Sequence, residues 1–197
     1  MSGDRSSGGN VTQTADRILD AAAEVLGVDP EAGLGDVATA AGVVRRTVYG
    51  YFPSRSHLVL ALTRRAALEI EDAIGAVDSG PADAMWAAFL GRVWPLVGRY
   101  RVLVALRRGP LGAEIHAELA PVDRSLAKLV RRGQDEGVFG VHLPAAVLGQ
   151  VAWSTVFSIA DHGLADGGLD ARAVTTSSLL LLGVTSDRVA EILDAPA

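Results

Sequence analysis

The chain has 197 residues, a formal net charge of −5 at pH 7 and no cysteine. Hydrophobic residues make up 49% of it, enough for a sizeable core in one large domain or two small ones. The missing cysteines exclude disulfides and thiolate metal sites and fit a reducing cytoplasm. The apolar runs are shorter than the roughly 18–20 residues of a membrane helix, and the N-terminus has no signal-peptide pattern. We therefore expect a cytoplasmic protein with no membrane partner.

Apolar residues recur at helical spacing along nearly the whole chain, and strand signals are almost absent. Residues 1–12 are expected to form a disordered tail. A helix is predicted over about residues 15–26, and a short second helix over 34–41. Gly42 is expected to end the second helix, because glycine readily adopts the left-handed turn that follows a helix.

A third short helix is predicted over residues 45–51. Pro53 prevents its continuation, and Ser54 is placed to cap a long linking helix over 54–77. A short helix, a glycine turn and a second short helix have the spacing of a helix-turn-helix. Residues 13–58 are therefore predicted to form a three-helix domain that binds DNA.

Gly, Pro, Ser and Asp cluster without periodicity over residues 75–83, which favours a domain boundary there. We expect residues 78–197 to form a helical ligand-binding and dimerisation domain, so the predicted fold class is all-α throughout. Its helices are predicted over about 82–100, 102–108, 113–136 (interrupted or restarted near Pro121), 144–162, from 171 onward and after 185, with a loop at 163–170.

The stretch from Thr39 to Arg65 contains five arginines and no Asp or Glu. Such a local cationic stretch in an acidic protein can face phosphate, although it can also be an accidental gap among carboxylates. Arg45 and Arg46 begin the predicted third helix, and arginine is the commonest reader of guanine. We expect these two side chains to contact bases.

Hydroxyl and guanidinium donors around this helix are expected to bind phosphates, or alternatively to be half-buried or solvated residues. The complete set of candidate DNA-contacting residues is Thr39, Arg45, Arg46, Thr47, Tyr49, Tyr51 and Arg55.

The segment "ATAAGVVRRTVYGYFPSRSHLVLAL", residues 38–62, resembles the signature of tetracycline-repressor (TetR) family transcriptional regulators. The resemblance covers about residues 14–62. It implies a ligand-responsive repressor that binds a palindromic DNA operator as a homodimer and is released by a small apolar or amphipathic effector. It implies no cofactor and no enzymatic activity. The matching residues are Ala38, Ala41, Gly42, Val43, Thr47, Tyr49, Tyr51, Phe52, Ser54 and Leu58.

The chain departs from the family pattern near the recognition helix. Val44 stands where a Ser or Thr usually caps this helix, which costs roughly 1 kcal/mol. Gly33 can still serve as an N-cap, whereas Gly35 is expected to supply no side-chain contact. Gly50 costs about 1 kcal/mol relative to alanine in a helix interior. These departures are expected to shift base reading onto the two arginines.

Aromatic residues in the second half are candidates for a ligand pocket, although ordinary core packing explains each one as well. The helices near 144–162 and 171–183 are rich in small and apolar residues and fit a four-helix dimer interface or an internal core. Polar candidates include His162. The candidate ligand residues are Trp86, Phe89, Trp94, Arg99, His116, Trp153 and Phe157.

Two other functions remain open. An enzyme is disfavoured because the sequence has no His-Glu-x-x-His, no paired Glu-x-x-His of a di-iron bundle, no Gly-rich phosphate loop and no Cys nucleophile. A degenerate family member that senses a ligand or scaffolds without binding specific DNA is compatible with the departures at the recognition helix.

Overall fold

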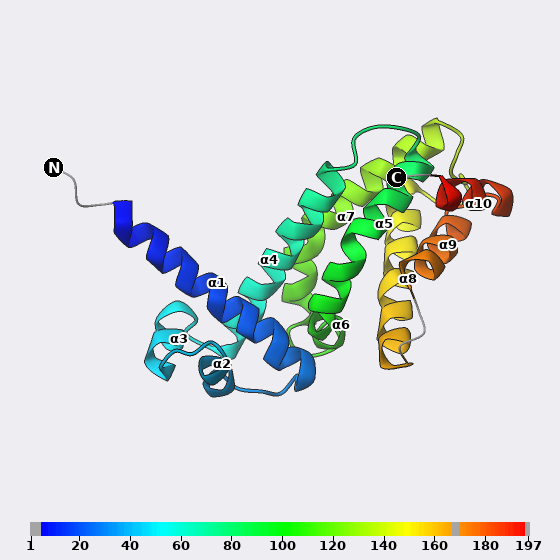
Figure 1. The fold of residues 1–197 in the computed structure, drawn as a ribbon. Helices are drawn as coiled ribbons and strands as arrows, with labels where there is room; N and C mark the ends of the chain where they lie inside the picture. The colour runs from blue at the N-terminus through cyan, green and yellow to red at the C-terminus, as the bar shows by residue number, and fades with distance from the viewer. Residues whose placement is uncertain (1–4, 167–169, 196–197) are drawn as a thin grey trace. The chain divides into compact units, whose positions relative to one another are not determined.

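The computed structural model describes the backbone of residues 5–166 and 170–195, and the side chains of residues 12–160 and 170–195. All regular structure in these residues is α-helical, as the apolar periodicity predicted (Figure 1). None of the helices in this described part combines the length and apolar character that crossing a bilayer requires. The ten helices described are α1 (Arg5–Val28), α2 (Leu34–Ala40), α3 (Arg45–Tyr51), α4 (Arg55–Gly75), α5 (Ala82–Arg99), α6 (Arg101–Leu106), α7 (Gly112–Asp135), α8 (Ala145–Asp166), α9 (Ala171–Leu181) and α10 (Ser186–Asp194).

The chain divides into two compact units. Unit 1 contains Met1–Arg65 and Val102–Glu118, and unit 2 contains Ala66–Arg101 and Leu119–Ala197. In unit 1, α2 packs against both α1 and α3; in unit 2, α9 packs against α5, α8 and α10. The two units are defined by which residues pack together, and they do not test the boundary between functional domains that the sequence predicted near residue 78.

The N-terminal segment differs from its prediction as a disordered tail. Residues 1–4 lie outside the described residues, whereas residues 5–12 continue α1. Extending an existing helix adds one hydrogen bond for each residue that is fixed, without a second nucleation step. The segment also contains no proline that would stop this extension.

In the second half, one helix is continuous where an interruption was expected, and another is longer than expected. The predicted interruption near Pro121 is wrong, because α7 continues through this residue. Ala117 and Pro121 are both exposed, so water can bond the carbonyl that the proline leaves without an N–H partner. The predicted loop at 163–170 is helical as far as Asp166, since it begins with residues that include the good helix formers Leu and Ala. Residues 167–169 lie outside the described ones.

Candidate nucleic-acid interface

The α2–α3 pair forms the predicted helix-turn-helix (Figure 1). Gly42 turns the chain between the two helices with φ of +64°, a conformation that glycine adopts without steric cost. Leu34 and Val37 of α2 are buried, and Val48 is the buried residue of α3. These apolar contacts hold one side of α3 inward and leave its other side exposed.

The caps around α3 agree with the sequence analysis. Val44 is the N-cap of α3, makes no side-chain capping bond and is 70% exposed. Ser54 precedes α4, and its Oγ accepts a hydrogen bond from the backbone N–H of His57 at 3.3 Å. The recognition helix therefore begins without the stabilising bond that the next helix possesses.

Two of the five arginines in the acid-free stretch pair with carboxylates elsewhere in unit 1. Arg64 bonds Glu118 with an Nη2–Oε1 distance of 2.5 Å, and this hydrogen bond raises the pKa of Arg64. Arg65 pairs with Asp20 at 3.0 Å. The folded chain therefore leaves fewer arginines of this stretch available for phosphate than the sequence suggests.

Arg45 and Arg46 in the first turn of α3 are exposed and have neither an ion-pair nor a hydrogen-bond partner among the described residues. Tyr49 is four residues after Arg45, on the same face of the helix, and is 53% exposed. Thr47 and Tyr51 are half-buried, and the Tyr51 ring lies 6.3 Å from that of Phe52, which is buried. Arg45, Arg46 and Tyr49 therefore form an exposed donor surface.

Thr39 and Arg55 already have partners within unit 1. The Thr39 hydroxyl donates to the carbonyl of Gly35 at 3.1 Å. Arg55 donates from Nε to the carbonyl of Ala32 at 3.2 Å and from Nη2 to the carbonyl of Pro30. These bonds tie the start of α4 to the α1–α2 loop. The phosphate contacts expected of Thr39 and Arg55 stay predictions, with Nη1 of Arg55 left to make one.

Gly35 takes part in a contact that sequence reasoning missed, because the guanidinium of Arg45 lies directly over it. The glycine at position 35 was a signal for a close contact. Which residue lies over it depends on how α2 and α3 cross, and the sequence does not report this. Gly50 differs, since a Cβ added there meets nothing within 4 Å. Nothing in the structure explains a glycine at position 50.

Four of the candidate ligand residues lie together in unit 2, in an aromatic row made of Phe139, Trp86, Phe89, Trp153 and Phe157. Successive ring centroids along this row are 6.4, 5.9, 5.5 and 4.7 Å apart. Trp86, Phe89 and Trp153 are buried, whereas Phe157 is half-buried. The Trp86 Nε1–H donates to Oγ of Ser178 at 2.9 Å, which satisfies the buried indole.

Phe139 is the member of this row that sequence reasoning missed. Its ring lies over Gly133, where a Cβ would come within 2.7 Å of the ring carbon Cγ. The glycine six residues before the phenylalanine in "RRGQDEGVF" was the signal for this contact.

The remaining ligand candidates do not join the row. Trp94 is half-buried and has no ring partner among the described residues. Arg99 pairs with Glu69 at 3.5 Å and lies 5.6 Å from the centre of the Tyr100 ring. His116 belongs to unit 1, with Nδ1 2.6 Å from the carbonyl of Gly112 and Nε2 3.3 Å from Arg107. The side chain of His162 lies outside the described residues.

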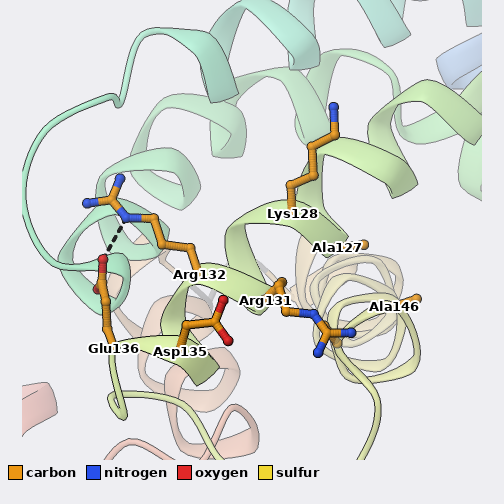
Figure 2. A pocket seen from close by; sticks show the side chains of 8 residues that line it. Ala127, Lys128, Arg131, Arg132, Asp135, Glu136 and Ala146 are labelled. Carbon is orange, nitrogen blue, oxygen red and sulfur yellow. Dashed lines mark hydrogen bonds and ion pairs between the residues drawn. The ribbon is translucent and has the colours of Figure 1, made fainter.

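A surface groove of about 590 Å³ lies in unit 2 between the C-terminal half of α7 and the start of α8 (Figure 2). Its lining is largely charged and includes Lys128, Arg131 and Asp135, and none of the candidate ligand residues lines it. Arg132 and Glu136 also line the groove, and they form an ion pair with each other at 2.6 Å.

A known protein family matches the part of this chain that contains the helix-turn-helix. A family model described as "Bacterial regulatory proteins, tetR family" matches residues 18–62. The HTH-type transcriptional repressor LfrR of Mycolicibacterium smegmatis (strain ATCC 700084 / mc(2)155) is 49% identical over 74 residues, 36% of this chain. That match spans only 39% of the length of the repressor.

Two solved structures share the arrangement of helices. The TetR-like transcriptional regulator LfrR from Mycobacterium smegmatis, in complex with proflavine, has a TM-score of 0.67 and 28% identity, over 87% of this chain and 95% of that one. The fatty acid degradation regulator FadR from Bacillus halodurans has a TM-score of 0.75 at 21% identity, over 85% and 94% of the two chains, and supports the fold alone. Residues 18–62 are thus similar to the tetR family of bacterial regulatory proteins, and the helices of the chain are arranged as in the TetR-like regulator LfrR.

Proposed function

We propose that this chain is a ligand-responsive transcriptional regulator that represses by binding a palindromic DNA operator as a homodimer. The observation that carries the proposal is the exposed first turn of α3, where Arg45 and Arg46 have no partner among the described residues. In a helix-turn-helix this turn meets base edges. The 49% identity to the repressor LfrR over 74 residues supports the proposal. Regulators of this family are not enzymes.

Residues 13–58 are the proposed DNA-binding domain, and residues 78–197 the proposed sensing and dimerisation domain. DNA contacts are assigned to the seven candidates around α3, of which Arg45, Arg46 and Tyr49 are exposed and have no hydrogen-bond or ion-pair partner among the described residues. Since its operator would be chromosomal, we place the protein in the cytoplasm.

Apolar side chains exposed on α8 and α9 support the proposed homodimer. Val147 and Val151 lie four residues apart on α8 and are 44% and 41% exposed. Leu180 and Leu181 on α9, which packs against α8, are 45% and 39% exposed. Pairing these two helices with their symmetry mates would bury the four side chains in a four-helix interface.

The proposed effector is a small apolar or amphipathic molecule that binds beside the aromatic row. The half-buried Phe157 end of the row offers an apolar ring surface, and the complex of LfrR with proflavine is a precedent for an aromatic ligand. An effector that binds one conformation of the dimer better than another changes DNA affinity by that difference in binding free energy.

Selection from a library of randomised duplex DNA at moderate salt tests the proposed function. The wild-type protein is expected to enrich a palindrome whose half-sites lie about one helical turn or more apart. The double variant Arg45→Ala/Arg46→Ala should enrich no sequence. Lys128→Ala/Arg131→Ala is the matched control, since it removes two exposed cations from the unit 2 groove and should still enrich the palindrome. Failure of the wild-type protein to enrich any sequence would favour the degenerate, non-binding alternative.

A further inference from the structure

The guanidinium of Arg45 occupies the space that a side chain at position 35 would fill. A Cβ built on Gly35 would lie 2.7 Å from Cζ and 2.5 Å from Nε of Arg45, and closer still to Nη2. Carbon atoms in favourable contact are about 3.5–4.0 Å apart. The absence of a side chain on α2 therefore allows an α3 side chain to cover the backbone of α2.

This contact places Arg45 differently from its neighbour. Arg45 is a residue of α3, but its guanidinium lies over Gly35 on the surface of α2. In a helix-turn-helix the second helix reads bases, while the first helix crosses the DNA backbone. A guanidinium lying on the first helix is therefore suited to a phosphate, whereas Arg46 begins the second helix without such a contact.

The guanidinium of Arg45 is also free to bind an incoming oxyanion. It has neither an ion pair nor a hydrogen bond among the described residues, so its contact with Gly35 leaves its N–H donors unused. The Gly35 carbonyl already accepts a hydrogen bond from Thr39. Arginine binds phosphate with charge-assisted, often bidentate, hydrogen bonds.

We propose that Arg45 binds a DNA phosphate from its position over Gly35, and that base reading at the start of α3 falls to Arg46. The inference rests on the proposed DNA binding. It replaces the base-reading role that the sequence predicted for Arg45. It also gives Gly35 a role, because the glycine holds the phosphate-binding side chain in place.

Gly35→Ala tests the positioning role. The backbone of Gly35 lies outside the positive-φ region, so alanine is tolerated there and only the flexible end of Arg45 has to move. The matched control is Gly91→Ala in α5, another helical glycine outside the positive-φ region, where a new Cβ meets nothing within 4 Å. Thermal unfolding of both variants verifies that they remain folded.

The measurement is the affinity for two duplexes of equal length, one enriched by the wild-type protein and one with the scrambled sequence, as a function of salt concentration. The slope of log affinity against log salt decreases by about 0.9 for each phosphate that the protein no longer neutralises, or about 1.8 for a symmetric dimer. Arg45→Ala is expected to show this decrease and to weaken binding to both duplexes by the same factor. Arg45→Lys should keep most of the slope, because a lysine retains the charge. It should also keep the base preference, since the planar fork that lysine lacks does not read a base at this position.

Gly35→Ala is expected to reduce the slope in the same direction as Arg45→Ala, and the double variant should bind no more weakly than Arg45→Ala alone. The proposal is overturned if Arg45→Ala or Arg45→Lys changes the preferred base at one position, or if Gly35→Ala binds like Gly91→Ala. If the wild-type protein itself binds both duplexes equally, the proposed function fails before Arg45 is tested.

Discussion

The arginines of α3 and of α10 illustrate two different uses of the same side chain. Arg188 in α10 bonds Asp83 in the first turn of α5, with an Nε–Oδ2 distance of 2.8 Å, and this bond raises the pKa of Arg188. The Asp83 side chain is 1% exposed, so the pair is part of the core of unit 2. Arg46 is exposed and has no carboxylate partner among the described residues. Arg188 stabilises the fold, whereas Arg46 is available to an external anion.

Arg188→Ala should have the largest effect on stability. It leaves the buried Asp83 carboxylate without its cation, which costs about 3 kcal/mol, near the lower limit for buried pairs because the Arg188 side chain is 39% exposed. Urea unfolding measures this change. Arg172→Ala is the matched control: its partner Asp194 is exposed, and the loss should stay below about 1 kcal/mol. Equal losses in the two variants would contradict the contrast between buried and exposed pairs.

Tyr49→Phe should weaken DNA binding and leave the stability of the free protein unchanged. The Tyr49 hydroxyl has no partner among the described residues, so its removal breaks no bond within the chain. Removing a hydrogen bond to a charged phosphate costs about 1.5 kcal/mol or more in each half-site. Mobility shifts should show equal weakening on all sequences, and a changed preferred site would show that the phosphate assignment is wrong.

Val44→Ser should stabilise the free protein by about 1 kcal/mol, because the serine hydroxyl can accept a hydrogen bond from the first turn of α3. Val44 already has the extended backbone of an N-cap, with φ of −76° and ψ of 148°. Val44→Ala is the control for removing the exposed apolar side chain. If both variants unfold at the same urea concentration, the absent cap does not limit the stability of α3.

Glu136→Gln should produce the smallest effect, a small loss of stability at neutral pH that disappears in acid. The backbone N–H of Ala82 donates to Glu136 at 2.8 Å and, together with Arg132, lowers the pKa of Glu136. The stability that the ionised group contributes is present above the ordinary glutamate pKa of about 4.3, and it is lost as pH falls through the lowered pKa of the folded state. Urea unfolding midpoints at pH 7 and pH 3 should therefore differ less in the variant than in the wild-type protein.

The helices and the helix-turn-helix could be predicted because their signals are local. Gly42, Pro53 and Ser54 mark where short helices end and the linking helix begins, and the structure has these boundaries. Burial of Leu58, Leu62 and the later apolar residues of α4 follows the same helical spacing. The error at Pro121 arose because a local signal for breaking a helix does not report which side of the helix faces water.

The partners of individual side chains could not be predicted, since they depend on how helices cross. Arg45 lies over Gly35, and Arg55 bonds the carbonyls of Pro30 and Ala32, more than twenty residues earlier. Sequence reasoning treated both arginines as free donors. In unit 2, burial of Trp86 and Phe89 was predictable from their spacing, but the ring contact of Trp86 with Phe139 was not.

Parallel selections by the wild-type protein and by Arg46→Ala from one randomised duplex library test the central claim most directly, with Arg131→Ala as the control for charge. We expect Arg46→Ala to lose preference at one base position in each half-site, at a cost of about 1–3 kcal/mol, while the rest of the palindrome and the stability of the protein are retained. Arg131→Ala should enrich the wild-type palindrome. An unchanged palindrome for Arg46→Ala, or an equal loss of affinity for every sequence, would contradict base reading by the unpaired arginine of α3.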